Sequence, residues 1–384
     1  MLFQNIVSSL LLLASIPAAQ ASDPVTKLAN HGIEIRKRYD DQLAAQGKQG
    51  CTSCTFENAA VRREWGSLSK KERKDYIDAV LCLQSKPSIT PRDEWPGVRT
   101  RYDDFVATHI NQSMSIHSYG LFLTWHRYFV WEYEQALHKE CGYNGTQPYW
   151  DWGAFAHDPV KSPVFDGSDT SMSGDGEYVP HNGTVIGIYT VPSGKGGGCV
   201  KSGPFKDMVV NLGPISPGMA GIESNGTGKD YNPRCLKRDI NPYLSKGWLK
   251  YSDITRLINK NDNHYWFVMK MMGSFMGTAP KDFNVHTAGH SVIGGDPGSD
   301  LFSSPGDPAF FLHHSQIDRT WWIWQNQKPK ERLYDLEGTH TIFNNPPSKN
   351  VTLDESVDLG VNAKPRVIRT MMDTMSGPFC YYYQ

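Results

Sequence analysis

The sequence predicts a mainly α-helical protein with long irregular loops and little β-structure. Apolar residues recur at helical spacing in five segments: 26–46, 56–85, 102–112, 124–141 and 252–272. Residues 159–233 are instead rich in Gly, Pro, Ser and Asp, a composition typical of ordered surface loops with short strands at most. The tail, from about 334 to 384, mixes turns with short extended segments. Helices are therefore expected to build most of the core.

Capping and helix-breaking residues suggest where these helices begin and end. Ser69 is the expected N-cap within the second segment, because Glu72 follows it at the spacing of a capping box. Lys86-Pro87 ends that helix, and Pro148 follows the fourth one. Two further helices are expected around residues 286–290 and 314–324.

The start of the chain is typical of a secretory signal peptide, residues 1–21. An apolar run over Ile6–Pro17 precedes Ala19-Gln20-Ala21, which offers a cleavage site after Ala21. The run is too short to span a membrane. Five N-x-S/T sequons are candidate glycosylation sites: Asn111, Asn144, Asn182, Asn225 and Asn350. The chain is therefore expected to be secreted to the extracellular space, with residues 22–384 forming one domain.

The cysteine count agrees with an oxidising compartment. There are seven cysteines, which allow up to three disulfides and one leftover thiol, with the connectivity left open. Cys199 and Cys235 could staple the glycine-rich segment, and Cys51 and Cys54 are interpreted as structural. A net charge of −1 gives no indication of nucleic-acid or anionic-membrane binding.

Histidines form two clusters about 160 residues apart. The first contains His109, His117 and His126. The second contains His286 and His290, one helical turn apart, with a third ligand from the pair His313-His314. Imidazole is the commonest protein ligand for zinc, copper and iron. Two triads predict two metal ions brought together by the fold.

The chemistry of this ligand set favours copper. Six neutral imidazoles and no carboxylate carry no net charge, so they stabilise Cu(I) as well as Cu(II), whereas Mg, Ca and Mn prefer oxygen ligands. Diiron bundles use Glu-x-x-His motifs, which are missing from the clusters. Two Cu(I) ions held close together can deliver two electrons to O₂. The sequence thus predicts a dinuclear copper centre that reacts with dioxygen.

The segments HSYGLFLTWHRYFVWEYE and DPAFFLHHSQIDRTWW resemble the two copper-binding signatures of the tyrosinase, catechol oxidase and hemocyanin superfamily. PYWDW, just after the first, also resembles the family, and the likeness runs from about Cys54 to the C-terminus. It implies a four-helix bundle around the two coppers, within a single domain of the short fungal type over residues 22–384. No C-terminal shielding domain is expected.

The resemblance also implies individual roles. His109, His117 and His126 match the ligands of the first copper, and His286, His290 and His314 those of the second, leaving His313 as a neighbour. Phe310 is expected to pack on the copper-bound rings, and Leu301 to gate the substrate entrance. From its position four residues after His314, Asp318 is expected to support that ligand or the structure around it.

Two departures from the family pattern concern the site, and the second refines the expected activity. Ser115 replaces the cysteine that some members link to the second histidine, so no thioether is expected. In the family that this chain resembles, many members that hydroxylate monophenols carry an Asn directly after the first histidine of the second site and a Glu upstream of it. This chain has Thr287 and Gly277 at those positions. The residues at positions 287 and 277 favour a catechol oxidase, which oxidises small o-diphenols to o-quinones and reduces O₂ to water.

Three alternatives remain open. The chain could be a full tyrosinase or an o-aminophenol oxidase with the same copper pair. It could be a dioxygen carrier, which is not an enzyme, although carriers usually block phenol access with another domain. A zinc hydrolase is a third possibility, although Glu is absent at position 287 and an HExxH motif is therefore missing.

Overall fold

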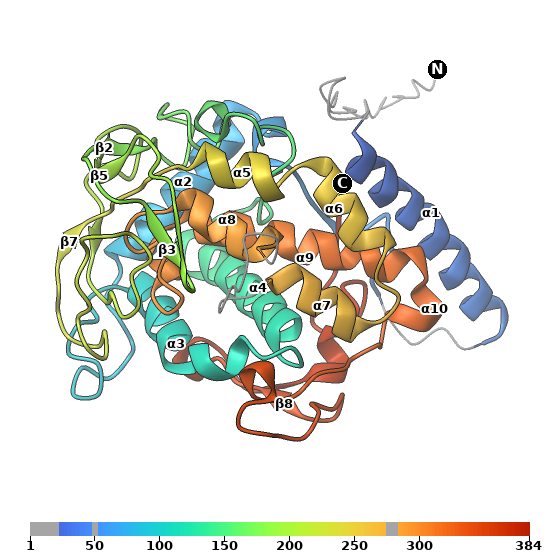
Figure 1. Cartoon of the computed structure of the whole chain (residues 1–384). Helices are drawn as coiled ribbons and strands as arrows, with labels where there is room; N and C mark the ends of the chain where they lie inside the picture. The colour runs from blue at the N-terminus through green and yellow to red at the C-terminus, as the bar shows by residue number, and fades with distance from the viewer. Residues whose placement is uncertain (1–22, 48–52, 274–282) are drawn as a thin grey trace, which may run out of the picture.

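The computed structural model describes residues 23–47, 53–273 and 283–384, and helices dominate it (Figure 1). The α-helices are α1 Pro24–Ala45, α2 Lys70–Ser85, α3 Arg101–Ile116, α4 Phe122–Cys141, α5 Pro242–Trp248, α6 Tyr251–Asn259, α7 His264–Met272, α8 Val285–Ile293, α9 Ala309–Gln327 and α10 Pro329–Arg332. The mainly α fold is confirmed. The predicted signal peptide 1–21, Cys51 and Gly277 lie outside the described residues. Within those residues, no helix is both long and apolar enough to cross a bilayer.

Four helices, α3, α4, α8 and α9, form a bundle at the centre of the molecule. Figure 1 shows α9 running through the middle, and α4 and α8 both pack against it. Nearly every residue of α9 is buried, including three tryptophans on its C-terminal half. A helix that is buried on all sides needs partners around its whole circumference, which α1, α4, α6 and α8 supply.

Several predicted helices change their limits in the structure. The capping box of Ser69 and Glu72 begins α2, as expected, but residues 60–62 ahead of it form a strand. The single helix expected over 252–272 is two helices, because the Asn263 side chain accepts a hydrogen bond from Trp266 N and starts α7 anew. Helix α5, which begins at Pro242 after the Asn241 cap, was missed by the sequence pattern.

The strands are short and pair two by two: β1 Ala60–Arg62 with β10 Tyr381–Tyr383, β2 Gly176–Tyr178 with β5 Gly197–Val200, β3 Thr184–Ile186 with β4 Tyr189–Val191, β6 Val209–Val210 with β7 Arg234–Cys235, and β8 Ser356–Val357 with β9 Arg366–Val367. Only the β1–β10 pair is parallel among them. The expected loops with little sheet are therefore confirmed, and the glycine-rich segment folds back on itself as hairpins.

Three disulfides join separate segments of the described chain. Cys199–Cys235 staples the glycine-rich segment, as expected. Cys82–Cys141 joins α2 to the end of α4, and Cys54–Cys380 fixes β10 beside β1. Cys54 therefore has no bond to Cys51, and the pairing spans almost the whole chain.

A buried ionic network lies behind the bundle and includes Asp318 of α9. One Asp318 oxygen accepts a bond from Arg127 Nε at 2.6 Å, and the other accepts from the hydroxyls of Tyr381 and Tyr383 at 2.7 Å each. Arg62 also lies 3.5 Å from Asp318 and stacks over the Tyr381 ring. We call these five residues the tyrosine–arginine network. They tie β1, α4 and β10 to α9.

The glycine-rich segment contains a half-buried acid with a shifted pKa. Burial raises the pKa of Asp175 from 3.8 to about 6, against the opposing effect of backbone N–H groups that donate to its carboxylate. Between these two values the folded protein binds more protons than the unfolded chain. Stability contributed by this site is therefore present below pH 4 and is lost as the pH rises through 6.

We therefore expect Asp175→Asn to gain stability relative to the wild type as the pH rises from 4.5 to 7. The difference in the free energy of unfolding should grow by about 2 kcal/mol, measured by urea unfolding at both pH values. Glu177→Gln, at an exposed site two residues on, is the control. A difference for Asp175→Asn that does not change with pH would contradict the assignment.

Candidate metal centre

The first cluster joins α3 to α4. His109 lies on α3, His117 at its C-terminal cap and His126 on α4, and all three side chains are buried. Each Nδ1 atom lies 2.7–2.8 Å from a backbone carbonyl oxygen. Because a carbonyl only accepts, each Nδ1 carries the proton and each Nε2 keeps its lone pair. This is the usual arrangement behind metal-binding histidines.

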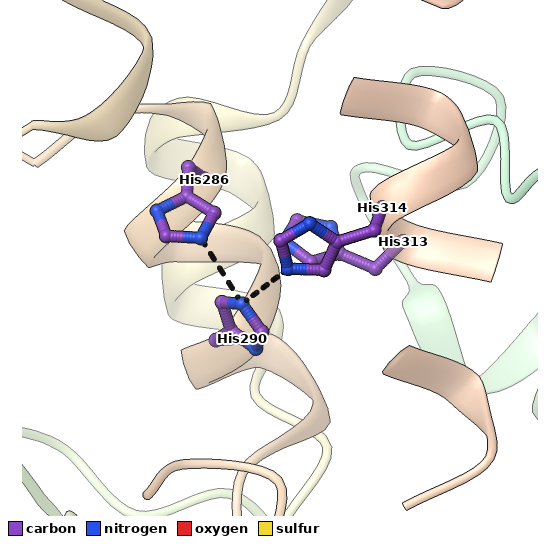
Figure 2. A group of neighbouring side chains, drawn as sticks. All are labelled: His286, His290, His313 and His314. Carbon is purple, nitrogen blue, oxygen red and sulfur yellow. Dashed lines mark hydrogen bonds between the residues drawn. The ribbon is translucent and has the colours of Figure 1, made fainter. Parts of the chain in front are cut away.

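The second cluster brings α8 and α9 together. Figure 2 shows His290 between His286 and His314, with its Nε2 atom 3.2 Å and 3.1 Å from theirs. Imidazole nitrogens this close together could hold one metal ion jointly. His313 completes a group of four whose ligand atoms lie within 4.8 Å of one another.

Burial makes the clustered imidazoles neutral. It lowers the pKa of His117 to about 4 and that of His109, His126 and His314 well below the ordinary 6.5. Neighbouring histidines lower the latter three further. Neutral imidazole is the form that binds a metal, so the folded chain keeps the donors ready at neutral pH.

The two clusters face each other across a shell of aromatic rings. The His126 and His314 rings stack with their centroids 4.5 Å apart, which joins one cluster to the other. Phe310 stacks on His314 at 4.1 Å, as the resemblance led us to expect. Phe122, which the sequence did not single out, lies 4.6 Å from the His286 ring. The sequence prediction that the fold brings six histidines together is thus met by the geometry.

The two clusters differ in how their rings are held from behind. In the first cluster, each Nδ1 atom is hydrogen-bonded to a backbone carbonyl. In the second, the buried Nδ1 atoms of His290 and His314 have no hydrogen-bond partner among the residues the structure describes. The orientation of these rings therefore depends on packing, and Phe310 stacks on that of His314. The His313 ring centroid lies 4.6 Å from that of His290.

A cavity of about 330 Å³ opens above the clusters. Its lining includes His117 and His290, one from each cluster, together with Thr287 and Leu301. The hydroxyl of Thr287 donates to the carbonyl oxygen of Met272 at 2.7 Å. The sequence did not predict the remaining wall, because its residues belong to no motif: Val185–Gly187, Ser216–Gly218, Ser291, Ser299, Asp300 and Ser304.

One acid fixes two walls of this cavity. Asp300 accepts from Ile215 N and Ser216 N with one oxygen, and from Phe302 N and Ser303 N with the other. Its carboxylate is thus committed to backbone groups and holds the 215–216 loop beside Leu301. Asp318, by contrast, lies in the tyrosine–arginine network. It lies four residues after His314 on α9, and its hydrogen bonds come from Arg127, Tyr381 and Tyr383.

The glycosylation candidates lie mostly on the surface. Asn111, Asn144, Asn182 and Asn350 are exposed, whereas Asn225 is half-buried. The Asn225 Nδ2 atom, where a glycan would attach, is itself buried.

Comparison with known proteins agrees with this geometry. The tyrosinase family, described as the common central domain of tyrosinase, matches residues 99–327. The chain is 39% identical over 345 residues to Tyrosinase P of Aspergillus terreus, covering 87% of this chain and 94% of the relative. It is 40% identical over 359 residues to N-acetyl-6-hydroxytryptophan oxidase ivoB of Emericella nidulans, covering 86% and 94%.

A solved structure is also similar over nearly the whole chain. The polyphenol oxidase of Thermothelomyces thermophila superposes with a TM-score of 0.87 at 41% identity, covering 96% of this chain and 100% of the other. The bundle and its clustered histidines thus define a copper-dependent oxidoreductase. Within that class, the chain belongs to the tyrosinase family, on the fungal side of the type-3 copper superfamily.

The family implies a dinuclear copper centre, and the residues present fit one. The donor set is nitrogen only, which suits copper. The buried Nε2 atoms of His109 and His126 have no hydrogen-bond partner within the described residues. A buried lone pair without a partner is costly, so an ion at this position would remove the cost.

Proposed function

We propose that this protein is a polyphenol oxidase of the catechol oxidase type, which converts o-diphenols to o-quinones. His109, His117 and His126 hold one copper, and His286, His290 and His314 hold the other. Each diphenol loses two electrons and two protons, so two diphenols reduce one O₂ to two molecules of water. The copper pair, when bound, supplies the path by which these electrons reach dioxygen.

The observation that carries this proposal is the cavity of about 330 Å³ with a histidine of each cluster in its lining. A single aromatic ring can therefore reach both clusters at once. Leu301 and the aliphatic side chains of Val185 and Ile186 exclude water beside the ring, and Phe310 fixes the plane of His314 from behind. The oxygen atoms of the diphenol can then approach the metal side of the cavity in one orientation.

Thr287 supports diphenol oxidation over monophenol hydroxylation. In the members that hydroxylate monophenols, the resembling position carries an Asn that helps to hold a water. Here the side chain is a hydroxyl whose proton is committed to Met272 O. The comparisons include relatives named both tyrosinase and oxidase, so their names leave this distinction open.

Oxygen uptake with catechol, tyramine and 2-aminophenol tests the proposal directly. We expect rapid uptake with catechol and slow uptake with tyramine after a long lag, because no amide side chain follows His286. Thr287→Asn is the informative variant and should raise the tyramine rate relative to catechol. Brisk oxidation of tyramine by the unaltered protein would instead favour tyrosinase activity, and preference for 2-aminophenol would favour an o-aminophenol oxidase.

A dioxygen carrier is the second candidate, from a different class of protein. The open cavity disfavours it, since a carrier must keep phenols away from the metals. Reversible O₂ binding without catechol turnover would support the carrier. Metal analysis that finds zinc and no copper would support a hydrolase.

Secretion is part of the proposal. The three disulfides are compatible with an oxidising compartment, and four of the sequons are exposed. The signal peptide 1–21, the single copper domain 22–384 and glycans at the sequons remain predictions.

A further inference from the structure

Four imidazoles surround the second metal position, although three suffice for a site that keeps an open position for a reactant. The fourth, His313, is adjacent to His314 on α9 and is fully buried. If His313 also bound the ion, the open position would be filled. The structure shows what prevents this.

The indole N–H of Trp152 donates to His313 Nδ1 across 3.1 Å. An indole nitrogen can only donate, so Nδ1 must be the atom with the lone pair. The proton of the neutral ring then lies on Nε2. Both nitrogens are therefore occupied, one by a hydrogen bond and the other by its own proton, and neither offers a lone pair to a metal.

Gly289 holds the same ring in place from the opposite helix. Gly289 lies between His286 and His290 on α8, and a Cβ atom at this position would lie 2.1 Å from Cε1 of His313. The imidazole thus occupies the space that any other residue would fill. Glycine inside a helix costs about 1 kcal/mol relative to alanine, so its presence there needs such a reason.

We propose that Trp152 keeps His313 out of the coordination shell of the second copper and so preserves an open ligand position there. Gly289 provides the notch in which the locked ring lies, so that His313 separates α8 from α9 without binding the metal. Trp152 and His313 are positioning residues on this account. The inference rests on the proposed assignment of His286, His290 and His314 as copper ligands.

Azide binding to the copper-loaded protein tests whether the position is open. In Trp152→Phe the lone pair of His313 is released, and we expect the azide dissociation constant, measured by optical titration, to rise about tenfold. Removing the competing ligand as well, in Trp152→Phe/His313→Asn, should restore the wild-type value. The His313→Asn variant alone keeps an acceptor for Trp152 and should bind azide normally.

Trp150→Phe is a matched control. Trp150 is equally buried in the same segment and its ring lies 6.3 Å from that of His313, but its Nε1 has no hydrogen-bond partner among the described residues. It should leave azide binding unchanged. Equal weakening in Trp152→Phe and in the double variant would show that Trp152 acts by packing alone, which overturns the proposal. No weakening in Trp152→Phe overturns it too.

The tautomer can be tested without copper. In metal-free protein with ¹⁵N-labelled histidine, the signals missing from His313→Asn identify His313, and we expect its proton on Nε2. A proton on Nδ1 would contradict the proposal even if a variant fails to bind metal. Copper content separates this outcome from failure of the proposed function, because fewer than two coppers per chain in the wild type would count against the dicopper assignment itself.

Discussion

His290→Ala should retain about one copper per chain and lose diphenol oxidation, with kcat/KM for catechol reduced about 10³-fold or more. The reason is geometric. The Nε2 atom of His290 lies within 3.2 Å of both His286 Nε2 and His314 Nε2, so its loss opens the middle of the second cluster. The first cluster depends on other helices and on its own carbonyl partners, so it should keep its ion.

Metal analysis and electron paramagnetic resonance measure this result. A coupled pair of Cu(II) ions is silent, whereas a single remaining Cu(II) gives a signal. His31→Ala, at an exposed site on α1, is the control and should keep both coppers. Full activity in His290→Ala would refute the ligand assignment.

Asp318→Ala should lower the free energy of unfolding by about 3–5 kcal/mol, because it leaves the buried guanidinium of Arg127 without its carboxylate partner. Arg127 is fully buried and its Nε donates to Asp318 at 2.6 Å. The hydroxyls of Tyr381 and Tyr383 lose their acceptor at the same time. Urea unfolding measures the effect.

Asp354→Ala provides the matched comparison. Asp354 also pairs with an arginine, Arg369, but both side chains are exposed, and such pairs contribute little. We expect the unfolding curve of this variant to overlay that of the wild type. Similar losses in both variants would show that the network contributes no more than a surface ion pair.

Local sequence patterns predicted the helices and the histidine clusters because both are short-range features. Ser69 and Glu72 mark the start of α2 within four residues, and His286 and His290 share one helix face. The prediction that His314, and not His313, is the third ligand of the second metal required the family resemblance, since the spacing of the histidines does not distinguish the two. The Trp152 hydrogen bond gives that choice a physical reason, but it joins residues 161 positions apart.

Long-range pairing explains what the sequence did not predict. Residues 60–62 look helical by composition, yet they pair with Tyr381–Tyr383, more than 300 residues away. The cavity wall could not be predicted for the same reason. Val185 and Ser216 lie in segments without periodicity and reach the histidine clusters only through tertiary contacts. The sequence did contain one indication of the packing around His313. Gly289 lies inside a helix between two histidines, where glycine is unfavourable unless another group occupies the space of its side chain.

The pairing of β1 with β10 has a consequence for how the protein is made. Asp318 and Arg62 acquire their tyrosine partners only from β10. A ribosome delivers these residues after every histidine of the two clusters. A nascent chain therefore carries all the clustered histidines before the two hydroxyls behind α9 exist. Assembly of the bundle and completion of the tyrosine–arginine network are thus separated in time, and the ion pairs of Arg127 and Arg62 with Asp318 can form before β10 pairs with β1.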